Sequence, residues 1–220
     1  MEKKLHLSAS PHVHSGKSTA GIMGDVLIAL APAALAGTVI FGLRSLLVML
    51  VTVAACVGFE ALFNVITKKD QTVGDLSACV TGLLLALNLP ADIPLWQCVV
   101  GSAFAILLVK CLFGGIGCNF ANPAISARVF MLVSFSGYMS FANPTIVDTV
   151  AGATPLGGGS AKLSDLFLGL HGGAIGETCA LALLLGLAYL LVKKVITWHI
   201  PATFVGSVFL LSLFATPCES

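Results

Sequence analysis

Long apolar runs separated by short polar segments constrain the fold of this chain more than any other feature. Ile22–Phe41 and Ser45–Ile66 are each close to the roughly 20 residues that an α-helix needs to cross a bilayer. Further apolar runs follow at Leu76–Leu89, Leu95–Phe113, Ile125–Phe135, Ile175–Val192 and Pro201–Phe214. Only 10% of the residues are charged, compared with about 25% in a soluble domain. The pattern predicts an all-α, polytopic membrane protein with about seven transmembrane or re-entrant helices.

Polarity divides the chain into three parts. Residues 1–21 are polar and basic and are expected to form a cytoplasmic segment, residues 22–214 a transmembrane helical domain, and residues 215–220 a short C-terminal end. The polar head lacks the apolar core of a cleavable signal peptide, so the first apolar helix is expected to act as its own insertion signal. The net charge of +1 gives no reason to expect a nucleic-acid partner.

Neither a metal site nor a nucleotide site is expected. The seven cysteines are scattered, mostly within apolar runs and without a CxxC pair, which is typical of small buried side chains. His12 and His14 have no further ligand close by in the sequence. Ser15–Thr19 is similar to the end of a phosphate-binding loop, but Pro11 stands where that motif needs its first glycine.

The distribution of lysine and arginine predicts the orientation. If each apolar run crosses once, most basic residues fall on one side: Lys3, Lys4, Lys17, Lys68, Lys69, Lys110, Arg128, Lys193 and Lys194. The other side receives only Arg44 and Lys162. Because basic loops stay in the cytoplasm, we expect a cytoplasmic N-terminus in a bacterial cytoplasmic membrane. The polar interval 138–173 is then extracytoplasmic.

A break rich in glycine and amides, Gly114–Ala124, separates two apolar runs. Polar backbone at membrane depth is tolerated only where it is buried in protein or lines a cavity, so Asn119 and Asn122 are candidates for holding a polar ring system or an ion. The alternative is a cytoplasmic turn in which Asn122 caps a helix that has Pro123 at its first position. The residues alone leave both interpretations open.

Within the polar interval, the segment Asp148–Leu156 carries the hydroxyl of Thr154 among small neighbours. Small neighbours leave this hydroxyl open to a modifying enzyme, and Pro155 biases Thr154 toward an extended backbone. The alternative is an ordinary glycine-rich turn.

Two carboxylates lie inside the first two apolar runs, Asp25 near the start of the first and Glu60 near the end of the second. An ionisable group in a membrane segment is expensive and indicates function by default. Both are expected near the interfaces, within reach of water, which keeps a purely structural role equally open.

Together these segments resemble the D subunit of the Rnf electron-transport complex and, more distantly, the B subunit of the sodium-translocating NADH:quinone reductase. The resemblance extends over essentially the whole chain. It is carried by Ser18-Thr19 with Ile22–Val26, by Gly114–Asn119 with Asn122–Ala124, and by Asp148–Leu156. The last segment is similar to the family's flavinylation motif, an Asp followed, after two variable residues and usually Ser, by Gly-Ala-Thr. Ala151 stands where many relatives have Ser.

The resemblance implies that a flavin transferase attaches FMN through its phosphate to Thr154, with Asp148, Gly152 and Ala153 forming the motif that the transferase recognises. It also implies a bundle of about ten helices in two inverted repeats, so a chain with about seven is expected to be truncated or to lack the last helices.

The implied function is electron relay from reduced ferredoxin toward NAD+, coupled to movement of Na+ or H+, in a complex with other membrane and peripheral subunits. Candidates for ion coupling are Asp25, Glu60, Asp75, Arg128 and Glu177. Asn119 and Asn122 are also candidates for binding a second, non-covalent flavin such as riboflavin.

Two other functions compete with this one. Inverted repeats with broken helices are typical of transporters, so a passive channel or small-solute transporter would also fit the Gly114–Ala124 break. A scaffold subunit without a redox role is the other alternative. Thr154 discriminates between them, because neither a channel nor a scaffold needs a flavinylation sequence.

Overall fold

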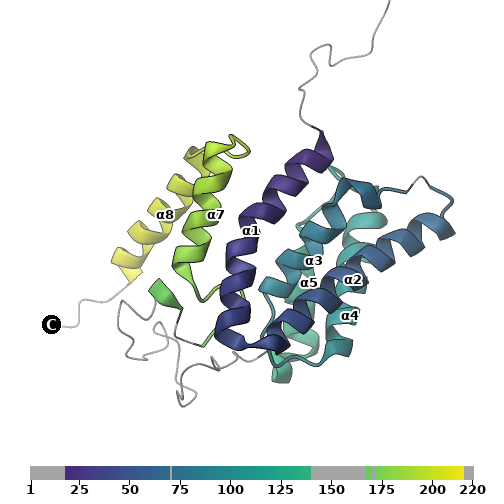
Figure 1. Cartoon of the computed structure of the whole chain (residues 1–220), viewed down its shortest axis with the longest axis horizontal. Helices are drawn as coiled ribbons and strands as arrows, with labels where there is room; N and C mark the ends of the chain where they lie inside the picture. The colour runs from purple at the N-terminus through teal and green to yellow at the C-terminus, as the bar shows by residue number, and fades with distance from the viewer. Residues whose placement is uncertain (1–17, 70, 140–166, 170–171, 216–220) are drawn as a thin grey trace, which may run out of the picture.

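The computed structural model describes residues 18–69, 71–139, 167–169 and 172–215 (Figure 1). Within these residues the regular structure is helical, which confirms the predicted all-α class. The expected flavinylation motif with Asp148, Gly152, Ala153 and Thr154 lies outside the described residues, as do His12 and His14.

The first two helices form the long hairpin that the sequence predicts. Helix α1 (Thr19–Phe41) is capped at its N-terminus by Ser18, whose hydroxyl accepts a hydrogen bond from the Gly21 amide at 3.1 Å. It turns directly into α2 (Leu43–Ile66) at Gly42, where a φ of 76° favours glycine. By length and composition, α1 and α2 are the two described helices that are long and apolar enough to cross a membrane.

The remaining helices are shorter. They are η1 (Val73–Asp75), α3 (Ser77–Leu87), α4 (Leu95–Ala103), η2 (Phe104–Cys111), α5 (Pro123–Ser134), η3 (Ser136–Tyr138), α7 (Ala180–Val192) and α8 (His199–Ala215). With 11 and 12 residues, α3 and α5 are each about 17 Å long, roughly half of the 30 Å hydrocarbon core. The premise that every apolar run crosses once is therefore wrong for these two runs, which have the length of re-entrant helices.

Helix α1 lies between two groups of helices (Figure 1). On one side, α2 packs along α3 and α4, and α5 packs against η2 and α3. On the other side α1 contacts α7, and α8 runs beside α7, with which it lines a groove. Most of the main apolar core lies within the group formed by α2 to α5 and includes Val48, Leu85, Ile93 and Met131, and the end of α1 also contributes to it.

The run Ile175–Val192 was expected to be helical throughout, but α7 begins only at Ala180. The preceding backbone bonds elsewhere: the amides of Ile175 and Gly176 donate to the carbonyl oxygens of Leu89 and Leu87, at 3.1 and 2.8 Å. One carbonyl belongs to the last residue of α3 and the other lies two residues beyond it, so neither has a partner within that helix. The segment before α7 therefore closes the end of α3 instead of extending its own helix.

Candidate functional site

A buried ion pair joins two helices deep in the group formed by α2 to α5. The ammonium of Lys110, in η2, lies 2.7 Å from Oε1 of Glu60, in α2, and their side chains are only 3% and 2% exposed. The same ammonium donates a hydrogen bond of 2.5 Å to the hydroxyl of Ser77, which is the first residue of α3. A charged pair removed from water in a membrane protein is costly unless its bonds are well satisfied.

Local backbone geometry brings the three side chains together. Helix α3 approaches α2 so closely at Gly82 that an added Cβ would lie 2.8 Å from the Val53 Cα, which places Ser77 within reach of the pair. Lys110 belongs to a π-helical stretch, where the Leu112 amide bonds to the Leu107 carbonyl. Stretches of π-helix are rare and frequently mark functional sites.

Polar groups extend the pair in two directions. Thr72 donates its hydroxyl to Glu60 Oε1 at 2.8 Å and accepts a bond from the Asn64 amide at 3.0 Å. On the other side, Ser77 donates its hydroxyl to Asp75 Oδ1 at 2.6 Å, and its backbone amide bonds to the same oxygen. Because Thr72 is exposed and Asp75 is partly exposed, both branches lead from the buried pair toward solvent.

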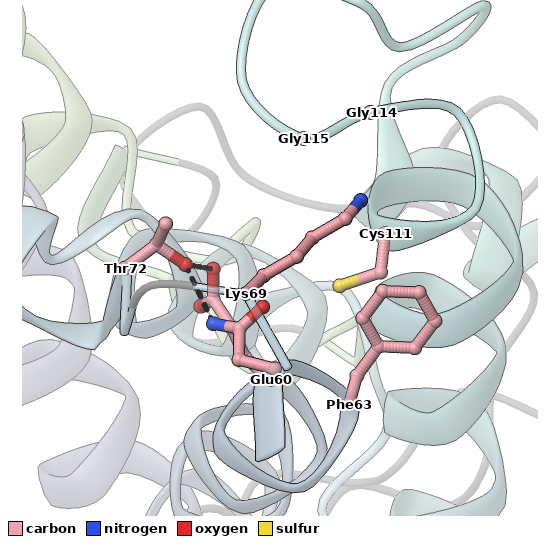
Figure 2. A pocket seen from close by; sticks show the side chains of 8 residues that line it. Glu60, Phe63, Lys69, Thr72, Cys111, Gly114 and Gly115 are labelled. Atoms are coloured by element: carbon pink, nitrogen blue, oxygen red, sulfur yellow. Dashed lines mark hydrogen bonds between the residues drawn. The ribbon is translucent and has the colours of Figure 1, made fainter. Parts of the chain in front are cut away.

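The second carboxylate oxygen of Glu60, Oε2, is buried and has no hydrogen-bond partner among the described residues. Glu60 also borders a small cavity of about 70 Å³, seen from close by in Figure 2. The cavity is lined by Glu60, Phe63, Asn64, Lys69, Thr72, Cys111, Gly114 and Gly115. Its lining thus joins the end of α2 to the glycines of the predicted break, and a buried carboxylate oxygen without a partner is available to bind a small cation or a proton.

Glu60 was expected within reach of water, and this expectation is wrong, because the side chain is 2% exposed. Glu60 can be buried because it pairs with Lys110. From the charge distribution along the sequence, Lys110 was interpreted only as a residue at the edge of an apolar run that sets the orientation of the chain in the membrane. The sequence nevertheless indicated that Lys110 needs a partner, because this cation lies inside the apolar run Leu95–Phe113.

The structure distributes the other coupling candidates over three places. Asp75 belongs to the network around Lys110. Arg128 pairs with Glu177 at 2.5 Å and also donates to the Asn88 amide oxygen at 2.6 Å, at a more exposed position. Asp25 lies apart from both and accepts a bond from the Tyr189 hydroxyl at 3.0 Å, which links α1 to α7.

The two asparagines of the break differ in their contacts. Asn122 Oδ1 accepts from the amides of Ala124 and Ile125, at 3.0 and 3.4 Å, so Asn122 caps α5 with Pro123 at the first position, as the alternative interpretation predicts. Asn119 Oδ1 is buried and has no partner among the described residues. Of the two side chains, Asn119 is therefore the one with an acceptor left over for another molecule.

The fold and the site define a class: a helical membrane protein with a lysine–glutamate pair buried between its helices. A model of the NQR2, RnfD, RnfE family matches residues 6–219, and the chain belongs to that family.

Individual relatives agree with this assignment. The chain is 46% identical to the D subunit of the Na(+)-translocating ferredoxin:NAD(+) oxidoreductase complex of Acetobacterium woodii, over 96% of this chain and 70% of the relative. It is 38% identical to the D subunit of the proton-translocating ferredoxin:NAD(+) oxidoreductase complex of Clostridium ljungdahlii, over 94% and 68%. Its identity to the B subunit of the Na(+)-translocating NADH-quinone reductase of Azotobacter vinelandii is 42% and covers 71% of this chain and 41% of the relative.

Proposed function

We propose that this chain is a membrane subunit of an ion-translocating ferredoxin:NAD+ oxidoreductase complex, and that it relays electrons and couples their transfer to the movement of Na+ or H+. The observation that carries the proposal is the 46% identity to the D subunit of such a complex over 96% of this chain. As one member of a complex, the chain acts only together with the others.

The redox part of the proposal depends on Thr154. Its sequence context, Asp148 followed by Gly152-Ala153-Thr154, supports attachment of FMN through a phosphoester by a flavin transferase. FMN would supply the electron chemistry, and a covalent link to a loop would keep it at a high effective concentration near its redox partners.

Replacing Thr154 by Val tests this assignment. The side chains are nearly isosteric, so the variant should keep its fold and lose the covalent flavin completely. The measurement is in-gel flavin fluorescence of the denatured protein, coexpressed with a flavin transferase, followed by mass analysis of the peptide that contains residue 154. The wild type should carry the mass of FMN minus water on Thr154. If it carries no flavin while a control substrate of the transferase does, a channel or a scaffold becomes the better description.

The ion-coupling part rests on the buried network. Glu60 combines burial, an unpartnered oxygen and an adjacent cavity, whereas Asp25, Arg128 and Glu177 each have partners outside that cavity. We therefore rank Glu60 first among the coupling residues. The two ferredoxin-dependent relatives above are named for different ions, Na+ and protons, so the ion has to be measured for this chain.

Replacing Glu60 by Gln in the intact complex, reconstituted into sealed vesicles, tests this ranking. The variant keeps the shape of the side chain but removes its charge. Ion uptake per electron transferred should fall at least tenfold, measured with ²²Na+ and with a pH-sensitive dye in parallel. Arg128→Gln is the control and should change the ratio less than twofold. Equal ratios in the wild type and Glu60→Gln would move ion coupling away from this site.

A further inference from the structure

Lys110 lies between two carboxylates of different exposure. Its ammonium contacts Glu60 directly and reaches Asp75 through one intervening hydroxyl, because Ser77 accepts from Lys110 at 2.5 Å and donates to Asp75 at 2.6 Å. Glu60 is buried, whereas Asp75 is partly exposed. A short movement of the ammonium along the Ser77 hydroxyl would therefore exchange one carboxylate partner for the other.

The pair is not arranged for maximum stability. Glu60 Oε2 is buried and unpartnered among the described residues, although the ammonium lies beside the other oxygen. A buried pair that serves only to hold helices together needs its remaining lone pairs satisfied, since each unsatisfied polar atom costs free energy. The unpartnered oxygen and the cavity beside it leave room for a second ligand on the same carboxylate.

An ammonium and a second cation cannot both bind this carboxylate well. They would lie within a few ångströms of each other in surroundings of low polarity, where like charges repel strongly. A lysine side chain has several rotatable bonds and can withdraw its charge, which a guanidinium held by a bidentate pair could not do as easily.

From these observations we propose that Lys110 is an internal cation that competes with the transported ion for Glu60, and that it yields by moving toward Asp75. This inference rests on the proposed ion-coupling function of Glu60. With the ion absent, Lys110 neutralises Glu60. When the ion binds, Lys110 pairs with Asp75, and its return to Glu60 displaces the ion. No bond is made or broken, and the buried carboxylate always keeps one positive partner.

The competition predicts an unusual sign for one substitution. In Lys110→Met the competitor is gone, so Na+ should bind at least tenfold more tightly. Asp75→Asn removes the second partner, which should hold Lys110 at Glu60 and weaken Na+ binding severalfold. In the double variant Asp75→Asn should have no further effect, because there is no ammonium left to relocate.

The experiment is equilibrium binding of ²²Na+ to the detergent-solubilised protein, purified with the subunits that accompany it. Lys69→Met is the matched control, because Lys69 borders the same cavity but is exposed and lies over the Phe63 ring at 5.8 Å. It should change Na+ affinity less than threefold. If the transported ion is a proton, Lys110→Met should instead show the infrared band of a protonated carboxylic acid, and the band should disappear in Lys110→Met/Glu60→Gln.

The outcomes separate this inference from the function on which it rests. If Glu60→Gln abolishes ion uptake but Lys110→Met neither binds Na+ more tightly nor protonates Glu60, the coupling function stands and the competition is refuted. If Glu60→Gln changes nothing, the coupling function itself fails at this site. Should Lys110→Met fail to fold, Asp75→Asn decides alone, and unchanged or tighter Na+ binding in that variant refutes the competition.

Discussion

The two ion pairs in the described part of this protein have almost the same length and very different surroundings. Lys110 and Glu60 lie 2.7 Å apart and are 3% and 2% exposed, whereas Arg128 and Glu177 lie 2.5 Å apart and are 29% and 49% exposed. Solvent screens the second pair and can solvate either partner if the other is removed. In the buried Lys110–Glu60 pair, solvent cannot replace a partner that has been removed. Bond length therefore says little about the role of an ion pair, and burial says much more.

The largest effect is expected when the buried pair is broken on one side. Lys110→Met leaves the Glu60 carboxylate buried without its counter-charge, which should lower the free energy of unfolding by about 3–5 kcal/mol. The measurement is unfolding in mixed detergent micelles without Na+. The double variant Lys110→Met/Glu60→Met should recover most of this loss, since no charge remains buried. If the double variant were as unstable as the single one, the loss of stability could not come from the unpaired buried charge of Glu60.

An intermediate effect is expected from the helix contact that positions the buried pair. In Gly82→Ala the new Cβ would lie 2.8 Å from the Val53 Cα, so α3 has to shift away from α2. Overpacking of this kind costs about 1–3 kcal/mol, measured by the same unfolding experiment. Gly58→Ala, on α2 with nothing within 4 Å of an added Cβ, is the control and should be close to neutral.

The smallest effect is expected at the exposed pair. Arg128→Gln should lower the free energy of unfolding by about 1 kcal/mol or less, because exposed pairs contribute little. Raising the salt concentration should reduce the difference further, and it should not change the effect of Lys110→Met to the same degree. A loss at Arg128 as large as that at Lys110 would show that burial does not separate the two pairs.

Much of the fold could be predicted from the sequence, because apolar runs and helix caps are local signals. The α1–α2 hairpin, the break after η2 and the cap of α5 by Asn122 all follow from residues that are close together in the sequence. The delayed start of α7 could not be predicted, because the amides of Ile175 and Gly176 bond to carbonyls near the end of α3. An apolar composition looks the same whether a segment is helical or pairs with a distant backbone.

In the candidate site, too, single residues could be predicted from the local sequence, but their contacts with distant residues could not. Glu60 and Asp75 could be selected one by one, because a carboxylate in or beside an apolar run stands out. Their connection through Lys110 and Ser77 could not, since it depends on the close approach of α3 to α2 and on the π-helical stretch that carries Lys110. The role of Thr154 stays a prediction, because it lies outside the described residues.

The bonds from Ile175 and Gly176 to Leu89 and Leu87 also set an order of assembly. During synthesis α3 leaves the ribosome long before residues 175 and 176, so the carbonyls at its C-terminal end have to wait for their partners. Within a bilayer such carbonyls are poorly tolerated without a hydrogen bond. The group formed by α2 to α5 can therefore be completed only after the segment that precedes α7 has been synthesised, which makes the last step of its assembly depend on residues far along the chain.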